Sequence, residues 1–148
     1  IQDEIVRTIT IQLLGEIEIT SLQRSKRKPT ENFSSYELLL RGKEQHHVFS
    51  KEANARALAF FDKAIELDSG NAQAHAWKTC TLAQGMARGY IEGDPEPVQK
   101  AALDHLSMAH DLNENDFEVH RMLANVYLSN HDYAKGRTWT QSLSAQPE

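Results

Sequence analysis

Histidine and cysteine side chains are the groups in this 148-residue chain that could bind a metal ion or act as a nucleophile. The adjacent His46 and His47 would point about 100° apart on a helix, so they do not readily chelate one ion. His105 and His110 are five residues apart, which is a poor spacing for one helical face. Cys80, the single cysteine, has no nucleophile motif around it. We therefore expect ordinary helical histidines, no metal site and no cofactor.

Three carboxylates at alternate positions, on Glu92, Asp94 and Glu96, form the other pattern that could bind a divalent cation. The segment lacks the further ligands and the glycine placement of a calcium loop. Pro95 directly follows Asp94, which is the pattern of a helix N-cap with proline at the first helical position. We predict that Asp94 begins a helix and that the acidic segment is a turn.

Motifs for catalysis and for membrane insertion are absent from the sequence. The seven glycines form no phosphate-binding loop, and there is no Gly-x-Ser-x-Gly nucleophile elbow. No run approaches the roughly 18 apolar residues of a membrane span, and no signal peptide is recognisable. One cysteine excludes an intramolecular disulfide. We expect a cytoplasmic protein that is not itself an enzyme and does not enter a membrane.

The elements that would position these side chains are helices. Apolar residues make up 40% of the chain, which has only seven Gly and four Pro and is rich in helix formers. Two segments 45 residues apart share one pattern of small and large apolar residues. They are Ala57/Phe61/Ala64/Leu67 and Ala102/Leu106/Ala109/Leu112. Turn formers follow each segment, at 68–71 and at 113–116, so both should be helices that pack closely against neighbours.

This pattern resembles the second helix of the tetratricopeptide repeat (TPR), which carries Ala, a large apolar residue and Ala, and ends in an acidic residue. The first helices of the repeats are then expected at 36–47, 72–88 and 117–133. The family's pair of Leu followed by Gly or Ala corresponds here to Arg41-Gly42, Lys78-Thr79 and Leu123-Ala124. The phase of the middle helix depends on Ala74, Trp77, Thr81 and Leu82. His75 and His120 fall at equivalent positions, where the family has a bulky residue, so packing explains them better than ligand binding.

The resemblance implies an all-α fold of about seven helices. An N-terminal amphipathic helix would be followed by three irregular TPR-like antiparallel helix pairs in a right-handed superhelix. The expected domains are a helix at 1–23, a basic linker at 24–32 and a repeat domain at 33–148. The pairs cover roughly 33–69, 72–114 and 116–146, with an insertion at 85–97 and a last helix at 132–145.

The N-terminal segment, residues 2–22, is amphipathic. Ile5, Ile9, Leu13 and Ile17 are spaced by four residues, which predicts a helix. Residues 15–19 alternate apolar and polar side chains as a strand would, but the four-residue spacing persists over a length typical of helices. The apolar stripe needs a partner, either the repeats or the same helix of a second chain.

A cluster of positive charges follows this helix, although the chain has a net charge of −5. Arg24, Lys26, Arg27 and Lys28 place four cations in five residues, and Pro29 ends the run. Such a run could bind nucleic acid or anionic lipid. It is short and has no aromatic neighbour, so a solvated linker is the favoured interpretation and no nucleic-acid partner is expected.

A second resemblance concerns residues 1–71. The helix beginning Gln2-Asp3-Glu4-Ile5-Val6, the basic linker, Pro29-Thr30-Glu31-Asn32 and Leu40-Arg41-Gly42 resemble a junction in bacterial multidomain regulators. There, a TolB-like domain ends in such a helix and a TPR array follows, behind class III adenylate or guanylate cyclase domains or winged-helix DNA-binding domains. The chain begins at Ile1 and ends without a polar capping helix, which suggests a piece of a larger signalling or regulatory protein.

The concave face of stacked helix pairs is lined mainly by the first helix of each pair, and this face is the expected binding groove. By repeat register its residues are Lys43, His46, His47, Gln73, Ala76, Cys80, Gln84, Glu118, Arg121, Asn125 and Ser129. Arg121 and Asn125 share a face, as do residues that clamp a terminal carboxylate in some TPR grooves. Lys78 falls outside the groove register, which makes ordinary solvated polarity the favoured interpretation.

The sequence therefore favours a non-enzymatic scaffold that binds a peptide, a protein or a neighbouring domain of the parent chain. One alternative is a ligand-sensing regulatory domain that controls an attached output domain. Another is a structural spacer that forms a homodimer through residues 2–22.

Overall fold

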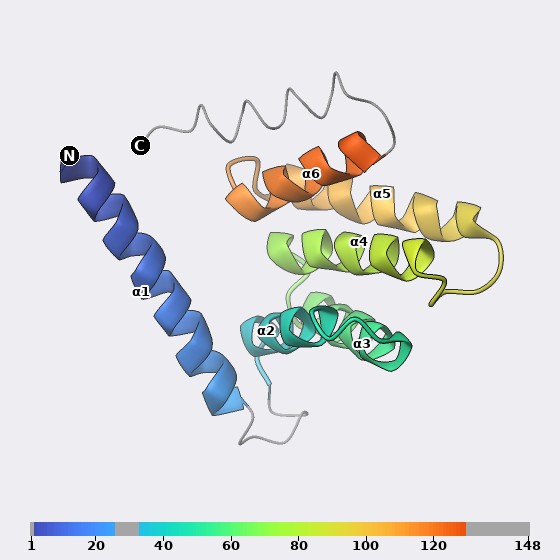
Figure 1. Ribbon diagram of the computed structural model, residues 1–148, viewed down its shortest axis with the longest axis horizontal. Coiled ribbons are helices and arrows are strands. Elements are labelled where there is room, and N and C mark those ends of the chain that lie inside the picture. Colours follow the sequence, from blue (N-terminus) through green and yellow to red (C-terminus); the bar gives the residue numbers. More distant parts are fainter. Residues whose placement is uncertain (1, 26–32, 130–148) are drawn as a thin grey trace.

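The computed structural model describes residues 2–25 and 33–129. Within these ranges the protein is all-helical, with six helices and no strand. The helices are α1 (Gln2–Ser25), α2 (Ser35–His46), α3 (Lys51–Leu67), α4 (Ala72–Ala87), α5 (Pro95–Leu112) and α6 (Phe117–Ser129) (Figure 1). The expected last helix at 132–145 lies outside the described residues.

Polar side chains fix the start of each helix in the repeat region. Ser34 and Glu37 form a reciprocal capping box before α2, with Ser34 Oγ accepting from the Glu37 amide at 3.2 Å. Asp94 caps α5, accepting from the Glu96 amide at 3.0 Å, and Pro95 occupies the first turn as predicted. The Glu92 carboxylate instead pairs with Lys51 Nζ at 2.6 Å, so Asp94 and Glu92 have separate structural roles.

Consecutive helices pack on one another, and α4 is the central element. It contacts α2, α3, α5 and α6, and it lies between the α2–α3 and α5–α6 layers (Figure 1). Fully buried alanines at Ala57, Ala64 and Ala109 allow the helices to approach, while the rings and chains of Phe61 and Leu106 fill the space between them. The predicted packing roles of these residues are confirmed.

The junctions α3–α4 and α5–α6 have the same hydrogen bonds 45 residues apart. The equivalent backbone pairs are Asp68 N to Ala64 O with Asn113 N to Ala109 O, and Asn71 N to Asp68 O with Asp116 N to Asn113 O. His75 Nε2 bonds Ser69 O, and His120 Nε2 bonds Glu114 O in the same way. Both imidazoles are buried, so each ring ties its helix to the preceding turn, in agreement with the predicted packing role.

Some predicted boundaries differ from the structure. The insertion expected at 85–97 is shorter, because α4 continues to Ala87 and α5 begins at Pro95. Gly85 belongs to α4 and is buried against the Ile91 side chain of the connecting segment. The N-terminal segment is helical, as favoured over the strand, and α1 continues to Ser25. Among the described helices it packs on α2 alone (Figure 1).

Candidate functional site

Trp77 lies at the centre of the surface formed by α2, α4 and α6. Its side chain is only 4% exposed, because cationic and imidazole groups from the neighbouring helices cover it. Lys43 Nζ on α2 and Arg121 Cζ on α6 lie 5.2 Å and 5.5 Å from the ring centroid, within cation–π range. The rings of His46 and His47 have their centroids 5.3 Å and 5.6 Å away. We call these five residues the Trp77 cluster.

Two carboxylates, one from α1 and one from α6, bind polar groups of the Trp77 cluster. Lys43 Nζ lies 3.2 Å from Glu18 Oε1 on α1 and 3.2 Å from Glu118 Oε1 on α6. Trp77 Nε1 donates to the other oxygen of Glu118. Arg121 has no carboxylate partner among the described residues, so its guanidinium is held only by the ring beneath it. Arg121 is therefore the cation of the cluster that a ligand could reach.

His46 has a defined tautomer. Thr81 Oγ1 donates to Trp77 O at 2.8 Å, so it accepts from His46 Nδ1–H, which lies 2.9 Å away. The unprotonated Nε2 faces Cys80 Sγ at 3.8 Å and the Gln84 amide nitrogen at 3.5 Å. Burial, followed by the positive charges of His47 and Arg121, lowers the pKa of His46 from 6.5 to about 4. His46 is therefore neutral at physiological pH.

Cys80, beside His46, carries a thiol rather than a thiolate at neutral pH. Burial raises the pKa of Cys80, and the charge of Arg121 acts against this shift. Gln84 is fixed next to it, because its amide donates to His46 O at 3.2 Å and its oxygen accepts from Asn54 Nδ2 at 3.1 Å. These neutral polar groups can donate and accept hydrogen bonds without requiring a charged ligand.

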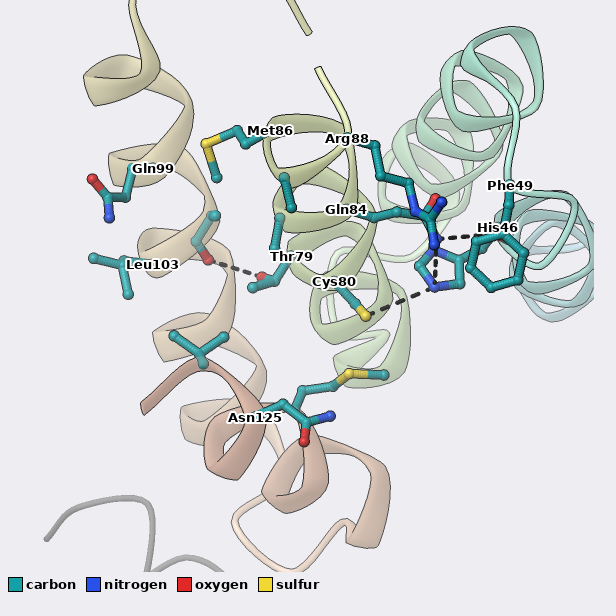
Figure 2. Close-up of a pocket in the computed structure, with 15 residues that line it drawn as sticks. His46, Phe49, Thr79, Cys80, Gln84, Met86, Arg88, Gln99, Leu103 and Asn125 are labelled. Atoms are coloured by element: carbon teal, nitrogen blue, oxygen red, sulfur yellow. Dashed lines mark hydrogen bonds between the residues drawn. The ribbon is translucent and has the colours of Figure 1, made fainter. Parts of the chain in front are cut away.

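A cavity of about 380 Å³ opens beside these groups, between α4, α5 and α6 (Figure 2). Its wall is mainly apolar, with Met86, Leu103 and Met122 among the lining side chains. The polar groups at its border are His46, Cys80, Gln84, Arg88, Gln99 and Asn125. Arg88 stacks over Phe49, 4.8 Å from the ring centroid, and closes the end nearest α2. The cavity can take an apolar group while amides at its border hold a polar backbone.

The structure gathers most of the predicted groove residues. Around the Trp77 cluster and the cavity lie Lys43, His46, His47, Cys80, Gln84, Glu118, Arg121 and Asn125. Gln73 lies apart, because its amide donates to Asp116 at the start of α6, at 3.2 Å. Ala76 is fully buried in the core, so its placement in the groove was wrong. The side chain of Ser129 lies outside the described part of the structure.

Trp77 was expected on the apolar side of its helix and is buried there, but sequence reasoning did not predict that the cations and imidazoles of the groove surround its ring. Trp77 is four residues after Gln73 and three before Cys80, so helical spacing placed it on the face already assigned to the groove. Its size favoured an interpretation as core. Lys78 points elsewhere and pairs with Asp62 on α3 at 2.6 Å, consistent with its predicted position outside the groove.

Two histidines that are far apart in the sequence lie close together in the structure, which residue spacing did not predict. His75 Nδ1 on α4 and His105 Nδ1 on α5 lie 2.9 Å apart. Burial, and then the nearby Lys78 and His75, lower the pKa of His105. Among residues 2–25 and 33–129, no group of three His, Cys, Asp or Glu side chains is placed to hold a metal ion.

Comparison with protein-family models, curated proteins and solved structures finds no match for this chain.

No helix within the described ranges has both the length and the apolar character needed to cross a membrane.

Proposed function

We propose that this chain is a non-enzymatic, TPR-like interaction module that binds an extended peptide segment along α2, α4 and α6. The observation that carries the proposal is the apolar cavity beside the Trp77 cluster, where predicted groove residues from three helices meet. An apolar side chain of the peptide would enter the cavity. One such cavity is sufficient for specific binding, because it would fix one side chain of the peptide while the neighbouring polar groups bind the peptide backbone.

The TPR-like assignment is supported by the recurrence of one junction at an offset of 45 residues. The α3–α4 and α5–α6 junctions share backbone bonds and a buried histidine, and fully buried alanines stand at equivalent helix contacts. In the proposal, α2 with α3 and α4 with α5 are helix pairs, α6 begins the third, and the pairs form a right-handed superhelix. The parent protein would be a cytoplasmic bacterial regulator with a cyclase or winged-helix output domain.

The polar groups of the groove suit a peptide backbone. Asn125 borders the cavity from α6 and can donate to a carbonyl and accept from an amide, and the side-chain oxygen of Gln84 on α4 can accept a second hydrogen bond. Arg121 adds one cation that has no carboxylate partner among the described residues. A peptide with an apolar anchor and an acidic group one or two residues away satisfies both features.

The test is selection of linear peptides against the full chain, followed by fluorescence anisotropy of a labelled hit. Ala87 lines the cavity and is exposed, so Ala87→Phe should fill the cavity without disturbing the core. We expect Ala87→Phe to weaken binding at least tenfold, equivalent to about 1.4 kcal/mol. Ala55→Phe, on the exposed side of α3 and outside the cavity, is the matched control and should bind as the original chain does.

Two results would contradict the proposal. One is that no linear peptide is selected above background. The other is that Ala87→Phe and Ala55→Phe affect binding equally, which would place the binding surface away from the cavity.

A second candidate function is ligand sensing, because a cavity of about 380 Å³ falls within the size range of small-molecule sites. A metabolite that binds only the native form must raise the melting temperature. Thermal-shift screening of the original chain beside Ala87→Phe separates this function from peptide binding, since a cavity ligand should shift the original chain alone.

A further inference from the structure

Helix α1 has eight exposed large apolar side chains, and five of them share one face. Ile5, Val6, Ile9, Leu13 and Ile17 are between 49% and 57% exposed, and four of them recur every fourth residue along the helix. They form a stripe about 18 Å long, which is half of the helix length of about 36 Å at 1.5 Å per residue. We call these five residues the α1 stripe.

The rest of the described chain does not cover the α1 stripe. The helix meets α2 through its other side, where Glu18 pairs with Lys43 and where Ile19, Leu22 and Leu40 line one shallow pocket. At about 100° per residue, these contact residues lie roughly opposite the stripe. Monomeric proteins rarely leave such a continuous apolar surface in water, so the stripe is expected to meet a partner.

The charges of α1 favour a second copy in the antiparallel direction. Asp3 and Glu4 lie at its N-terminus, while Arg24 lies at its C-terminal end and is followed in the sequence by Lys26, Arg27 and Lys28. A parallel pair would bring like charges together at both ends of the helix. An antiparallel pair keeps the acidic N-terminal ends of the two copies apart, and it also opposes the two helix dipoles.

We infer that the α1 stripe is a self-association surface through which two copies of this chain form an antiparallel, two-fold symmetric dimer. The symmetry axis passes near Leu13, so that Leu13 meets its counterpart and Ile9 of each copy packs on Ile17 of the other. This register brings Asp3 of one copy to the level of Gln23 in the second copy. The dimer is independent of the groove, and it presents two grooves on one assembly, which increases avidity for a paired partner.

Sedimentation equilibrium of the full chain across a wide concentration range tests the dimer. We expect a mass approaching twice 16.8 kDa as concentration rises. The double substitution Ile9→Asp/Leu13→Asp should leave a monomer, with circular dichroism showing that the remaining helices are retained. Ile11→Asp is the matched control, because Ile11 is 60% exposed but lies on the other side of α1, and it should still form dimers.

Disulfide cross-linking tests the orientation. In a Cys80→Ser background, Ile9→Cys mixed with Ile17→Cys should form a covalent heterodimer, because this register places the two positions opposite each other on the stripe, while either variant alone should not cross-link. A monomer at every concentration would overturn the inference, and so would equal disruption by Ile11→Asp. Self-cross-linking of Ile9→Cys would overturn the antiparallel orientation. Binding of another protein to the stripe of a strictly monomeric chain would also contradict it.

Discussion

Trp77 has two roles, because it packs between helices and also positions a charged side chain of the groove. Its indole fixes Glu118 on α6 and lies beneath Lys43 from α2, so it links three helices. The same ring holds Arg121 by a cation–π contact. Because its edges are occupied by imidazoles, water is excluded from the ring, which strengthens each electrostatic contact. Truncation of Trp77 would therefore change stability and groove shape together, which makes it a poor probe of binding alone.

His46 gives a pH-dependent stability with a defined sign. Its pKa of about 4 in the native state lies below the unfolded value of 6.5, so between these values the unfolded chain binds more protons. The free energy of unfolding is then highest above pH 6.5 and falls as pH decreases toward 4, by roughly 1–3 kcal/mol from this residue, because solvent screens part of the effect. His46→Asn keeps a donor to Thr81 and cannot titrate, so it should lose less stability on acidification.

Urea denaturation at neutral pH and near pH 4, followed by circular dichroism, measures this difference. The lowered pKa of His105 adds a loss in the same direction to both proteins, so the comparison between them isolates His46. Equal losses in the original chain and in His46→Asn would show that His46 titrates normally in the native state.

Residue spacing predicted which side chains share the groove, because helical periodicity alone places Cys80 with Gln84 and Arg121 with Asn125. It did not predict contacts between elements. The 2.9 Å contact of His46 with Thr81 and the pairing of Lys43 with both Glu18 and Glu118 depend on how α1, α2, α4 and α6 are placed in space. Distances between side chains on different helices are set by how the helices pack, and the spacing of residues within one helix does not give that information.

At the scale of elements, the positions of the helices could be predicted from capping residues and from the small residues at helix contacts. Turn formers at 68–71 and the Asp94–Pro95 pair marked helix boundaries because their side chains satisfy exposed amides. The insertion was predicted to begin too early, at residue 85, because the sequence pattern does not show whether Gly85 belongs to the helix. In the structure Gly85 lies inside α4, where the absence of a side chain lets Ile91 pack directly on the helix.

The contact of α2 with α3 depends on Gly42. A Cβ added there would clash with Cε1 of Phe61 and lie 2.7 Å from two further ring atoms. Phe61 is fully buried, so its ring cannot move into solvent. We expect Gly42→Ala to lower the free energy of unfolding by about 1–3 kcal/mol, as overpacking of a core does. Gly15→Ala, at an open position of α1, should cause no loss.

Chemical denaturation of the two glycine variants beside the original chain provides the measurement. The intrinsic helix preference of alanine acts in the same direction at both sites, so the difference between the variants reports the Phe61 contact. A Gly42→Ala protein as stable as Gly15→Ala would show that the α2–α3 contact adjusts to the extra methyl group.

For the whole molecule, the arrangement of helices predicts an uneven stability. Helix α4 contacts α2, α3, α5 and α6, whereas α1 packs on α2 alone within the described structure. Opening α4 disrupts contacts on both sides of the repeat region, while α1 can unfold and lose few buried contacts. An exposed helix of 24 residues is only marginally stable without tertiary packing.

Amide hydrogen exchange of the full chain at low and at high protein concentration measures this gradient together with the state of α1. In dilute solution the amides of α4 should exchange most slowly and those of α1 most rapidly, because only the latter open without disrupting the core. At high concentration the antiparallel dimer buries the α1 stripe, so exchange in α1 should slow while rates in α4 stay constant. Ile9→Asp/Leu13→Asp should abolish this concentration dependence and leave α4 unchanged. If α1 is as protected as α4 in dilute solution, another part of the same chain covers the stripe, and both the stability gradient and the dimer are contradicted.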